Sequence, residues 1–201
     1  MREEPLSPWL LRLAAYRLRH GAIVAYPTES VFGLGCDPLN GDAVARLLSL
    51  KQRPMEKGVI LISDCFERLC PYVGELPSDV LQQVLTHWPG AVTWLLPAAS
   101  GVPYWLTGRH STLAMRVTAH PVAAALCRAA GMPLVSTSAN LSGRPPARSA
   151  LQVRLRCGNA VDMLIHGETG GLLRPTPIRD ALSGETVPWS NYWFSHRRMK
   201  V

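Results

Sequence analysis

Short apolar runs, separated by polar loops and by segments with helical spacing, constrain the fold of this chain more than any other feature. The longest uninterrupted runs hold four or five residues, such as Ala22–Tyr26 and Val59–Ile62. A membrane-spanning helix needs roughly 20 apolar residues, so we expect no membrane span and a cytoplasmic protein. Since 47% of the 201 residues are apolar and 17% are charged, the chain can bury a sizeable core, which excludes a disordered chain and a coiled coil.

Helical and strand patterns alternate along the chain. Ser7 followed by Pro8 is typical of a helix start, and the helix is expected to end at Gly21, before a buried strand at Ala22–Tyr26. We expect further helices at Asp42–Leu50, Ser78–His87, Pro121–Ala130 and Ser149–Arg156, with Asp42 and Ser149 as helix caps, and further strands at Val59–Ile62, Val92–Leu96, Thr112–Val117, Leu134–Val135 and Val161–Ile165. Residues 27–35 are expected to form a loop. This mixture predicts an α/β domain with one central sheet, and ligand sites in such folds lie at strand ends.

Basic residues outnumber acidic ones by 21 to 14, which gives a net charge of +7, and 18 of the 21 are arginine. Arginine forks suit carboxylates and phosphates, so the excess favours anionic partners. The C-terminal stretch 186–201 adds to the charge because it contains basic residues and no acid. The five cysteines include no C-x-x-C pair, and we interpret them as reduced thiols rather than a disulfide frame or a zinc site.

The common nucleotide and hydrolase motifs are missing: the chain has no G-x-x-x-x-G-K-[ST], G-x-G-x-x-G, H-E-x-x-H or G-x-S-x-G. No His/Cys cluster has metal-binding spacing either. What remains is a set of polar loops. Lys51 and Arg53 stand one residue apart after an expected helix, and in extended chain they would point the same way and grip one anion. A solvated helix end, stabilised by the helix dipole, would have the same pattern.

Two other polar segments follow apolar strands. Ser136, Ser138 and Asn140 alternate, so in extended chain they present hydroxyl and amide groups on one face, although ordinary turn chemistry would also account for them. Arg116 stands among apolar neighbours on an expected strand and therefore needs a partner, either a carboxylate or a ligand. Thr28 offers a hydroxyl directly after the strand at Ala22–Tyr26.

Taken together and in order, these segments resemble the YrdC family of threonylcarbamoyl-AMP synthases, in its short bacterial form. The resemblance covers about residues 7–185, and the ordered set of motifs is specific although each one alone is modest. The matching stretches are Tyr26–Pro38, Leu50–Pro54, Trp88–Thr93, Ala114–Val117, His120–Pro121, Pro133–Gly143, Gly167–Gly171 and Ile178–Asp180.

The resemblance implies one YrdC-like α/β domain over residues 7–185, with a twisted, largely mixed central sheet flanked by helices and a deep basic cavity, followed by the basic, aromatic tail 186–201. It implies a nucleotidyltransferase that makes L-threonylcarbamoyladenylate and pyrophosphate from L-threonine, bicarbonate or carbon dioxide, and ATP. A separate transferase complex would then pass the threonylcarbamoyl group to an adenosine of tRNA. Mg²⁺ is expected to be carried with the phosphates, without a metal site made by the protein.

The resemblance also implies roles for individual residues. The family's polar quartet corresponds to Lys51, Arg53, Ser138 and Asn140. The catalytic candidates are Lys51 and Arg53; the nucleotide-binding candidates are Lys51, Arg53 and Ser138; the threonine-binding candidates are Thr28, Arg116, Ser136 and Asn140; and Glu29 is at most an outer-shell ligand of magnesium. The chain departs from many family members at Glu56–Gly58, Ile62 and Pro175–Arg179, so contacts from these positions are not carried over.

Two alternatives remain open at this stage. One is a non-catalytic protein of the same fold that binds double-stranded RNA or tRNA, since aromatic residues of the tail (Trp189, Tyr192, Trp193 and Phe194) stand close to Arg197 and Arg198 and would stack on bases. A tail that packs on the domain is the structural alternative to that role. The other is a paralogue with the same fold and a different substrate, because a fold alone does not fix a function.

Overall fold

A computed structural model describes residues 7–141 and 144–188. In these residues, nine strands form one mixed sheet with the order β7-β1-β2-β6-β3-β5-β4-β8-β9. Three neighbouring pairs of the described strands are parallel (β1 with β7, β3 with β5, β4 with β8) and the other five are antiparallel, which confirms the predicted single α/β domain with a mixed sheet. The strands are β1 Val24–Pro27, β2 Phe32–Gly35, β3 Ile60–Ser63, β4 Thr93–Pro97, β5 Thr112–Val117, β6 Leu134–Ser138, β7 Met163–Leu164, β8 Ile178–Asp180 and β9 Thr186–Val187.

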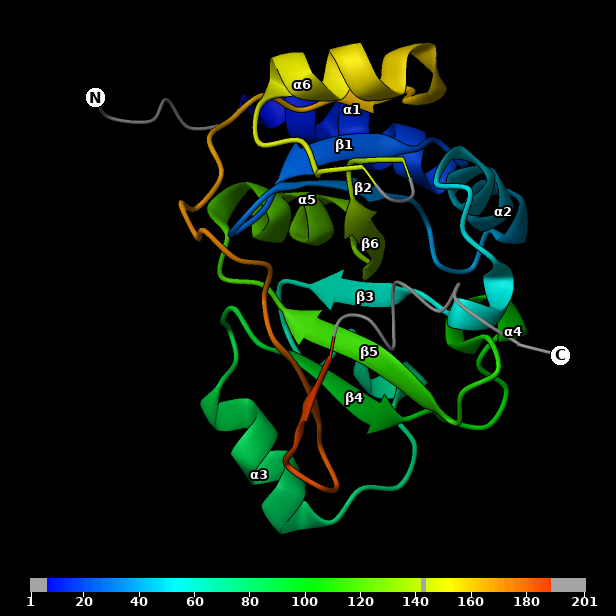
Figure 1. Cartoon of the computed structure of the whole chain (residues 1–201), viewed down its shortest axis with the longest axis vertical. Helices are drawn as coiled ribbons and strands as arrows, with labels where there is room; N and C mark the ends of the chain where they lie inside the picture. Colours follow the sequence, from blue (N-terminus) through cyan, green and yellow to red (C-terminus); the bar gives the residue numbers. More distant parts are fainter. Residues whose placement is uncertain (1–6, 142–143, 189–201) are drawn as a thin grey trace, which may run out of the picture.

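Helices cover both faces of this sheet. They are α1 Pro8–Arg19, α2 Gly41–Leu50, α3 Ser78–Thr86, α4 Tyr104–Thr107, α5 Pro121–Ala130 and α6 Ala150–Cys157, with short 3-10 turns η1 Met55–Lys57, η2 Cys70–Tyr72 and η3 Gly158–Ala160. Figure 1 shows α6 and α3 at opposite ends of the molecule, with strands β1 to β6 fanned out between them. None of the helices within residues 7–141 and 144–188 is long and apolar enough to cross a membrane.

Two apolar clusters hold these layers together. On one face, α1 and α5 bury residues such as Leu18 and Leu126 against Ile62 of β3. On the other face, α2, α3, α4 and α6 pack against neighbouring strand residues, as Leu47 of α2 does in the cluster that contains Leu61 of β3. Each fully buried leucine contributes about 1.5 to 3 kcal/mol relative to an exposed one. The alternation of Leu61 and Ile62 between the clusters is the period-2 pattern of a strand buried on both faces.

The helix ends follow local chemistry. Ser149 caps α6 as predicted, since its hydroxyl accepts a hydrogen bond from the amide of Gln152 at 3.3 Å. For α2 the predicted cap is wrong: the side chain of Asn40 accepts from the amide of Ala43 at 2.9 Å, and Asp42 lies inside the first turn. Asn and Asp both satisfy a free helix-end amide, and the observed cap lies two residues before the predicted one.

The expected loop at residues 27–35 is also wrong in part, because Phe32–Gly35 forms β2. Its glycines are needed for close packing rather than for a turn. A Cβ atom on Gly35 would lie 2.7 Å from the carbonyl oxygen of Val135 and 2.8 Å from the ring of Tyr26, so β2 tolerates no side chain there. Glycine in a strand interior commonly marks such a close approach.

The sheet also extends further than predicted at three other points, one of which is the unpredicted strand β8 at Ile178–Asp180. β6 continues to Ser138, three residues beyond the expected end at Val135. Of the expected tail, Thr186–Val187 forms β9 and pairs with β8. The aromatic and basic tail residues from Trp189 onward lie outside the described residues.

Candidate active site

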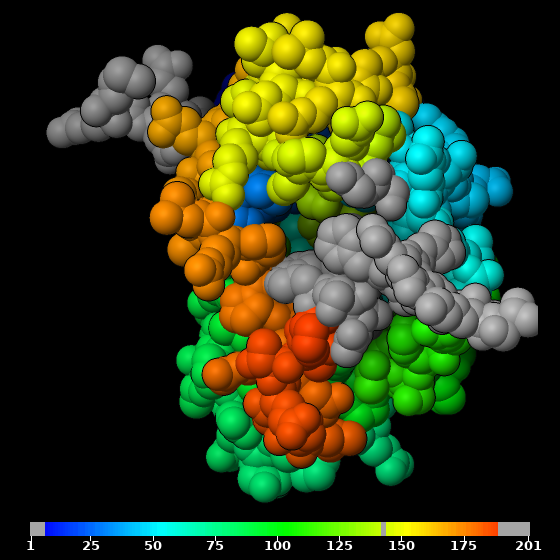
Figure 2. Space-filling model, in the orientation of Figure 1, coloured from blue at the N-terminus to red at the C-terminus, as the bar shows by residue number. Residues whose placement is uncertain are grey.

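A cavity with a volume of about 200 Å³ lies on the sheet where β3, β5 and β6 meet three loop segments. Figure 2 shows this region as a hollow bordered by the yellow segment that leads into α6 and the orange segment that leads to β8. The lining is rich in hydroxyl groups and contains no carboxylate. It consists of Thr28, Ser30, Val31, Gly33, Ile60, Arg116, Ser136, Thr137, Ser138, Asn140, Arg144, Pro146, Pro175 and Thr176.

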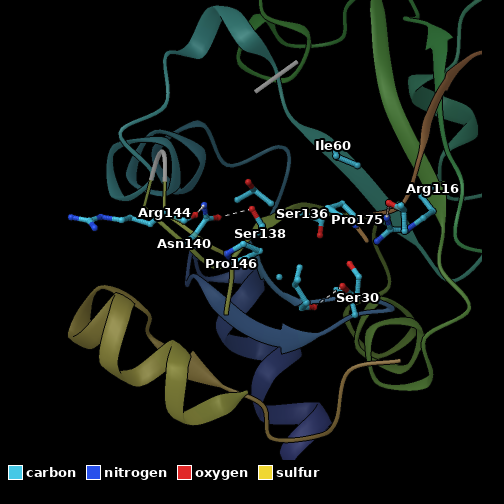
Figure 3. A pocket seen from close by; sticks show the side chains of 14 residues that line it. Ser30, Ile60, Arg116, Ser136, Ser138, Asn140, Arg144, Pro146 and Pro175 are labelled. Atoms are coloured by element: carbon cyan, nitrogen blue, oxygen red, sulfur yellow. Dashed lines mark hydrogen bonds between the residues drawn. The ribbon is translucent and has the colours of Figure 1, made fainter. Parts of the chain in front are cut away.

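Strand alternation explains why the polar strand residues meet at the cavity. Ile60 of β3 is opposite Ala114 of β5 and Ser136 of β6 in the sheet register. Arg116 follows Ala114 by two residues, so its side chain leaves the sheet on the same face. The face that α1 and α5 cover elsewhere therefore continues as the floor of the cavity. Figure 3 shows Arg116 at one end, Asn140 and Ser138 at the other, and Ser136 between them.

Five of the seven predicted site residues line this cavity: Thr28, Arg116, Ser136, Ser138 and Asn140. Lys51 and Arg53 are not among the lining residues. The hydroxyl of Thr28 donates to the carbonyl of Val31 at 2.7 Å and so closes the turn between β1 and β2. The structure thus brings together Ser136 and Ser138 of β6, Asn140 from the turn that follows β6, and the two others that the sequence placed at strands.

Asn140 organises one end of the cavity. Its Oδ1 accepts hydrogen bonds from Nζ of Lys51 and from Oγ of Ser138, both at 2.6 Å. Its Nδ2 donates to the carbonyl of Arg144 at 2.6 Å and to that of Leu141 at 3.0 Å. Nζ of Lys51 also donates to the carbonyl of Ser138. Because both ends of the Asn140 amide are engaged, it holds the lysine and the serine hydroxyl in fixed positions.

Lys51 is almost fully buried, with 2% of its surface exposed. Burial, reinforced by the nearby charge of Arg53, lowers the pKa of its ammonium group from 10.5 to about 7. A lysine with this pKa exchanges a proton near neutral pH, and perturbed groups of this kind cluster at functional sites.

The expectation that Lys51 and Arg53 point the same way is wrong. They lie on a turn, not in extended chain, because Gln52 between them adopts a left-handed backbone with φ of 48°. Lys51 turns toward Asn140, whereas Arg53 folds onto the start of β3. There, Nε of Arg53 donates to the carbonyl of Gly58 at 3.1 Å, and its Nη2 donates to the carbonyl of Lys57 at 3.2 Å. The reversal at Gln52 separates the two cations.

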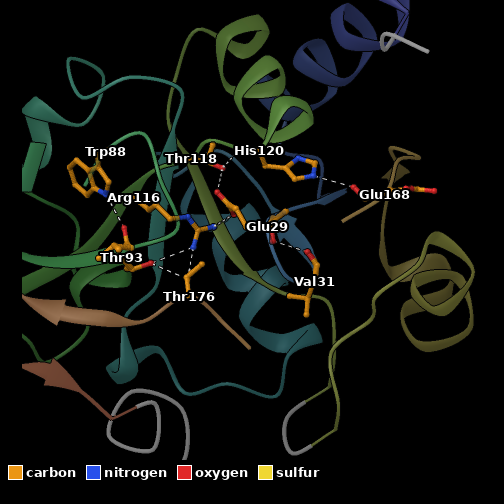
Figure 4. Close-up of polar contacts among 11 residues, drawn as sticks. Glu29, Val31, Trp88, Thr93, Arg116, Thr118, His120, Glu168 and Thr176 are labelled. Atoms are coloured by element: carbon orange, nitrogen blue, oxygen red, sulfur yellow. Dashed lines mark hydrogen bonds and ion pairs between the residues drawn. The ribbon is translucent and has the colours of Figure 1, made fainter. Parts of the chain in front are cut away.

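A buried ion pair forms the other end of the cavity (Figure 4). Nη2 of Arg116 lies 3.2 Å from Oε2 of Glu29, and its Nη1 donates to Oγ1 of Thr176 at 2.7 Å. Oε1 of Glu29 accepts from the hydroxyl of Thr118 at 2.6 Å. Burial alone would raise the pKa of Glu29, but Arg116 and the Thr118 hydroxyl outweigh it and hold the pKa below its ordinary value. The partner that the sequence required for Arg116 is therefore a carboxylate.

Sequence reasoning missed several residues of this site. Thr176 and Thr118 contact the ion pair, and Ser30 and Arg144 line the cavity. No contact was expected from the segment Pro175–Arg179, yet the hydroxyl of Thr176 accepts a hydrogen bond from Arg116. The available signal was a hydroxyl residue close to a strand end, which is too common to select one position.

The comparisons with known proteins fit this geometry. The family model of Sua5, YciO and YrdC, described as "Telomere recombination", matches residues 17–187. The chain belongs to the Sua5/YciO/YrdC family. This confirms the resemblance drawn from the sequence motifs.

Individual members of the Sua5/YciO/YrdC family match over most of the chain. A protein of Halorhodospira halophila named threonylcarbamoyl-AMP synthase is 56% identical over 177 residues, which cover 88% of this chain and 93% of that protein. The structure of P. abyssi Sua5 complexed with L-threonine superimposes with a TM-score of 0.83 at 33% identity and covers 88% of this chain and 52% of the other. E. coli YciO superimposes with a TM-score of 0.78 at 27% identity, covering 95% and 96% of the two chains.

The arrangement in this family member suits charge neutralisation rather than covalent catalysis. The cavity has the Arg116 guanidinium at one end, the Asn140 amide with a buried lysine and Arg144 at the other, and hydroxyl groups between. Such a set of fixed donors orients anionic reactants and stabilises charge that develops between them.

Proposed function

We propose that this chain is a threonylcarbamoyl-AMP synthase, an enzyme that supplies the threonylcarbamoyl group for the N6-threonylcarbamoyladenosine modification of tRNA. One observation carries the proposal: the polar lining expected of this activity converges on one cavity in a chain that belongs to the family. The naming of relatives at 49–56% identity as threonylcarbamoyl-AMP synthase supports it. The threonine bound in P. abyssi Sua5 supports an amino-acid site in the same fold.

The reaction joins three reactants and is a nucleotidyl transfer. The amine of L-threonine adds to carbon dioxide, which bicarbonate yields by loss of hydroxide, and the product is a carbamate that has released one proton. A carbamate oxygen then attacks the α-phosphorus of ATP, and pyrophosphate leaves. Both partners in the second step are anions, so their mutual repulsion is the main barrier in water. Preorganised cations and donors lower that barrier by orientation and by electrostatic stabilisation.

The residues divide between the amino acid and the nucleotide. Arg116 binds the threonine carboxylate, because a guanidinium is matched to that group. Thr28, Ser136 and Asn140 contact the threonine amine and hydroxyl or the carbamate. Ser138 contacts the nucleotide.

Lys51 and Arg53 bind the phosphates and the developing negative charge. The charge of Arg53 acts on Lys51 even though the two side chains diverge. The hydrogen bonds from Nζ of Lys51 to Asn140 and to the carbonyl of Ser138, two residues that line the cavity, support this role.

Magnesium enters with ATP as its phosphate complex. Mg²⁺ prefers carboxylate, phosphate and water oxygens, whereas the cavity lining offers hydroxyls, an amide and arginines. In the part of the chain that the structure describes, no three His, Cys, Asp or Glu side chains are grouped to hold a metal ion. The residues therefore do not fit a resident metal, and the ion belongs to the substrate.

The deciding assay measures pyrophosphate release from ATP. We expect release to require both L-threonine and bicarbonate, and labelled bicarbonate to appear in a threonine-dependent adenylate. Lys51→Ala and Arg53→Ala should each raise the activation free energy by about 3 to 4 kcal/mol, because each removes a preorganised donor. Turnover should therefore fall roughly 10²- to 10³-fold.

The matched control is Arg46→Ala. This exposed arginine pairs with Asp162 at 3.1 Å and does not line the cavity, so its loss should leave turnover unchanged. Near wild-type turnover in both the Lys51 and the Arg53 variants, with the fold intact by circular dichroism, would remove the assigned roles.

The competing hypothesis, RNA binding without chemistry, predicts a different result. Such a protein would bind double-stranded RNA or tRNA with steep salt dependence and would release no pyrophosphate. Handover of the product to a transferase complex is part of the proposed function and is tested by adding that complex and tRNA to the active enzyme.

A further inference from the structure

We propose that Glu29 is a positioning residue for the amino-acid substrate: it fixes the guanidinium of Arg116 at the end of the cavity and balances its charge. The inference rests on the proposed function, because it assigns a task to the residue behind the threonine carboxylate site. Glu29 does not itself line the cavity and acts through Arg116.

Glu29 is held rigidly on both its main chain and its side chain. It is 7% exposed, and Oε1 is occupied by the hydroxyl of Thr118 at 2.6 Å. Its carbonyl accepts from the amide of Leu172 at 3.0 Å. A Cβ atom on Gly170 would lie 3.0 Å from the Glu29 Cα, so the segment after Gly167 packs closely against the main chain of Glu29. A carboxylate fixed in this way is a stiff support for a guanidinium.

Arg116 receives its orientation from two sides. Oε2 of Glu29 forms an ion pair with Nη2 at 3.2 Å without hydrogen-bond geometry, and Oγ1 of Thr176 accepts a hydrogen bond from Nη1 at 2.7 Å. Nε of Arg116 is buried and has no hydrogen-bond partner within residues 7–141 and 144–188. A guanidinium carries five N–H donors in a fixed plane, so fixing both Nη groups also fixes where the remaining donors point. Arg116 lines the cavity, and those donors serve a carboxylate there.

The charges at the Arg116 end of the cavity favour a neutral amino acid over a simple anion. Glu29 and Arg116 together carry no net charge, and the other arginine of the lining, Arg144, lies at the opposite end beside Asn140 (Figure 3). A zwitterionic amino acid is also neutral, so its carboxylate gains oriented hydrogen bonds without leaving a buried excess charge. If Glu29 merely competed with the substrate for Arg116, its removal would strengthen threonine binding. If Glu29 positions Arg116, its removal weakens binding.

The test compares Glu29→Gln, which keeps the shape and loses the charge, with Glu29→Asp, which keeps the charge. We expect Glu29→Gln to raise the KM for threonine about 10- to 100-fold, as misplacement of a binding group does. The KM for ATP and kcat should stay within about threefold, and Glu29→Asp should recover part of the loss. The matched control is Asp64→Asn, which removes a carboxylate that is equally buried and pairs with Arg68 and Arg128 away from the cavity.

A double-mutant cycle with Arg116→Gln shows whether Glu29 acts through the arginine. Calorimetry measures the Kd for threonine in all four proteins, and we expect Glu29→Gln to change it less than about twofold when Arg116 is already gone. An equal change in both backgrounds, or an unchanged or lower KM for threonine in folded Glu29→Gln, would overturn the inference.

Two further outcomes can be distinguished from a failure of the role proposed for Glu29. If Glu29→Gln does not fold, Thr118→Val takes its place, because it removes the donor to Oε1; it should raise the KM for threonine about two- to fivefold, and no rise would overturn the inference. If the wild-type protein binds threonine but releases no threonine-dependent pyrophosphate, the proposed function fails, while the calorimetric cycle still decides the role of Glu29. A wild-type protein that does not bind threonine overturns both.

Discussion

Replacing Lys51 by methionine should make the protein more stable while it removes the activity. Lys51 is 2% exposed, and burial lowers its pKa to about 7. The surroundings of Lys51 in the folded chain therefore disfavour its charge and lower the stability of the fold. A residue with only a structural role is not expected to lower stability in this way. Methionine has a similar length and no charge, and it adapts to irregular space.

The size of the effect follows from the pKa and from the hydrogen bonds lost. A fall in pKa from 10.5 to about 7 corresponds to about 4 kcal/mol of folding free energy at pH 7. Methionine would remove this penalty but would also deprive the Ser138 carbonyl and Asn140 Oδ1 of one donor each, which costs about 1 to 2 kcal/mol in total. Asn140 Oδ1 keeps the Ser138 hydroxyl. We expect a net stabilisation of about 2 kcal/mol at pH 7.

The sign of the pH dependence provides a second test. Between about pH 7 and 10.5 the unfolded chain binds a proton at Lys51 that the folded chain has lost, so wild-type stability rises with pH in this window. The methionine variant lacks this contribution. Its advantage is greatest at pH 7 and below, and it disappears as the pH approaches 10.

Urea unfolding at pH 6, 7, 8, 9 and 10 measures the difference in free energy, and pyrophosphate release measures activity. Lys57→Met is the control, because Lys57 is only partly buried and its pKa is lowered less. A Lys51→Met protein that is less stable than wild type at pH 7, or whose advantage does not shrink as pH rises, would refute this reasoning.

Two more predictions concern packing and the metal. Gly35→Ala should destabilise the fold by about 2 to 4 kcal/mol in urea unfolding, because the new Cβ would lie 2.7 Å from a backbone oxygen that cannot move aside; a change below about 0.5 kcal/mol would contradict the close packing of β2. Chelation of Mg²⁺ by EDTA should abolish pyrophosphate release without changing the melting temperature, since the ion arrives with ATP; a lower melting temperature would reveal a structural metal.

The sequence predicted the parts of the fold that depend on one periodic signal. The helix at Pro121–Ala130 and the strand at Thr112–Val117 have the predicted bounds, because their apolar patterns and terminal residues agree. β2 was missed because glycine is also a turn signal, and only the neighbouring ring of Tyr26 shows why glycine is required. A local pattern cannot supply the identity of a neighbour across the sheet.

The residues of the candidate site also differ in whether a local sequence pattern could predict them. Ser136 and Ser138 were predictable together, because alternation on β6 places both on one face, whereas Asn140 lies beyond the end of β6, where the chain turns and its main-chain amide donates to the carbonyl of Ser138 at 2.9 Å. The pairing of Glu29 with Arg116 was not, since three strands separate β1 from β5 in the sheet and only the path of the loop after β1 brings Glu29 to Arg116. The apolar neighbours of Arg116 indicate that it needs a partner, but they do not show that the partner is Glu29.

The turn at Lys51 and Arg53 changes the kind of anion that this site suits. Extended chain would have aimed both cations at one small group, such as a carboxylate. Instead, the left-handed Gln52 sends Lys51 to Asn140 and Arg53 to the carbonyls of Lys57 and Gly58. An anion that interacts with both Lys51 and Arg53 has to be long enough to extend along the turn, as a triphosphate is. The departure from the predicted geometry therefore supports the proposed nucleotide at this end and the proposed binding of the threonine carboxylate by Arg116.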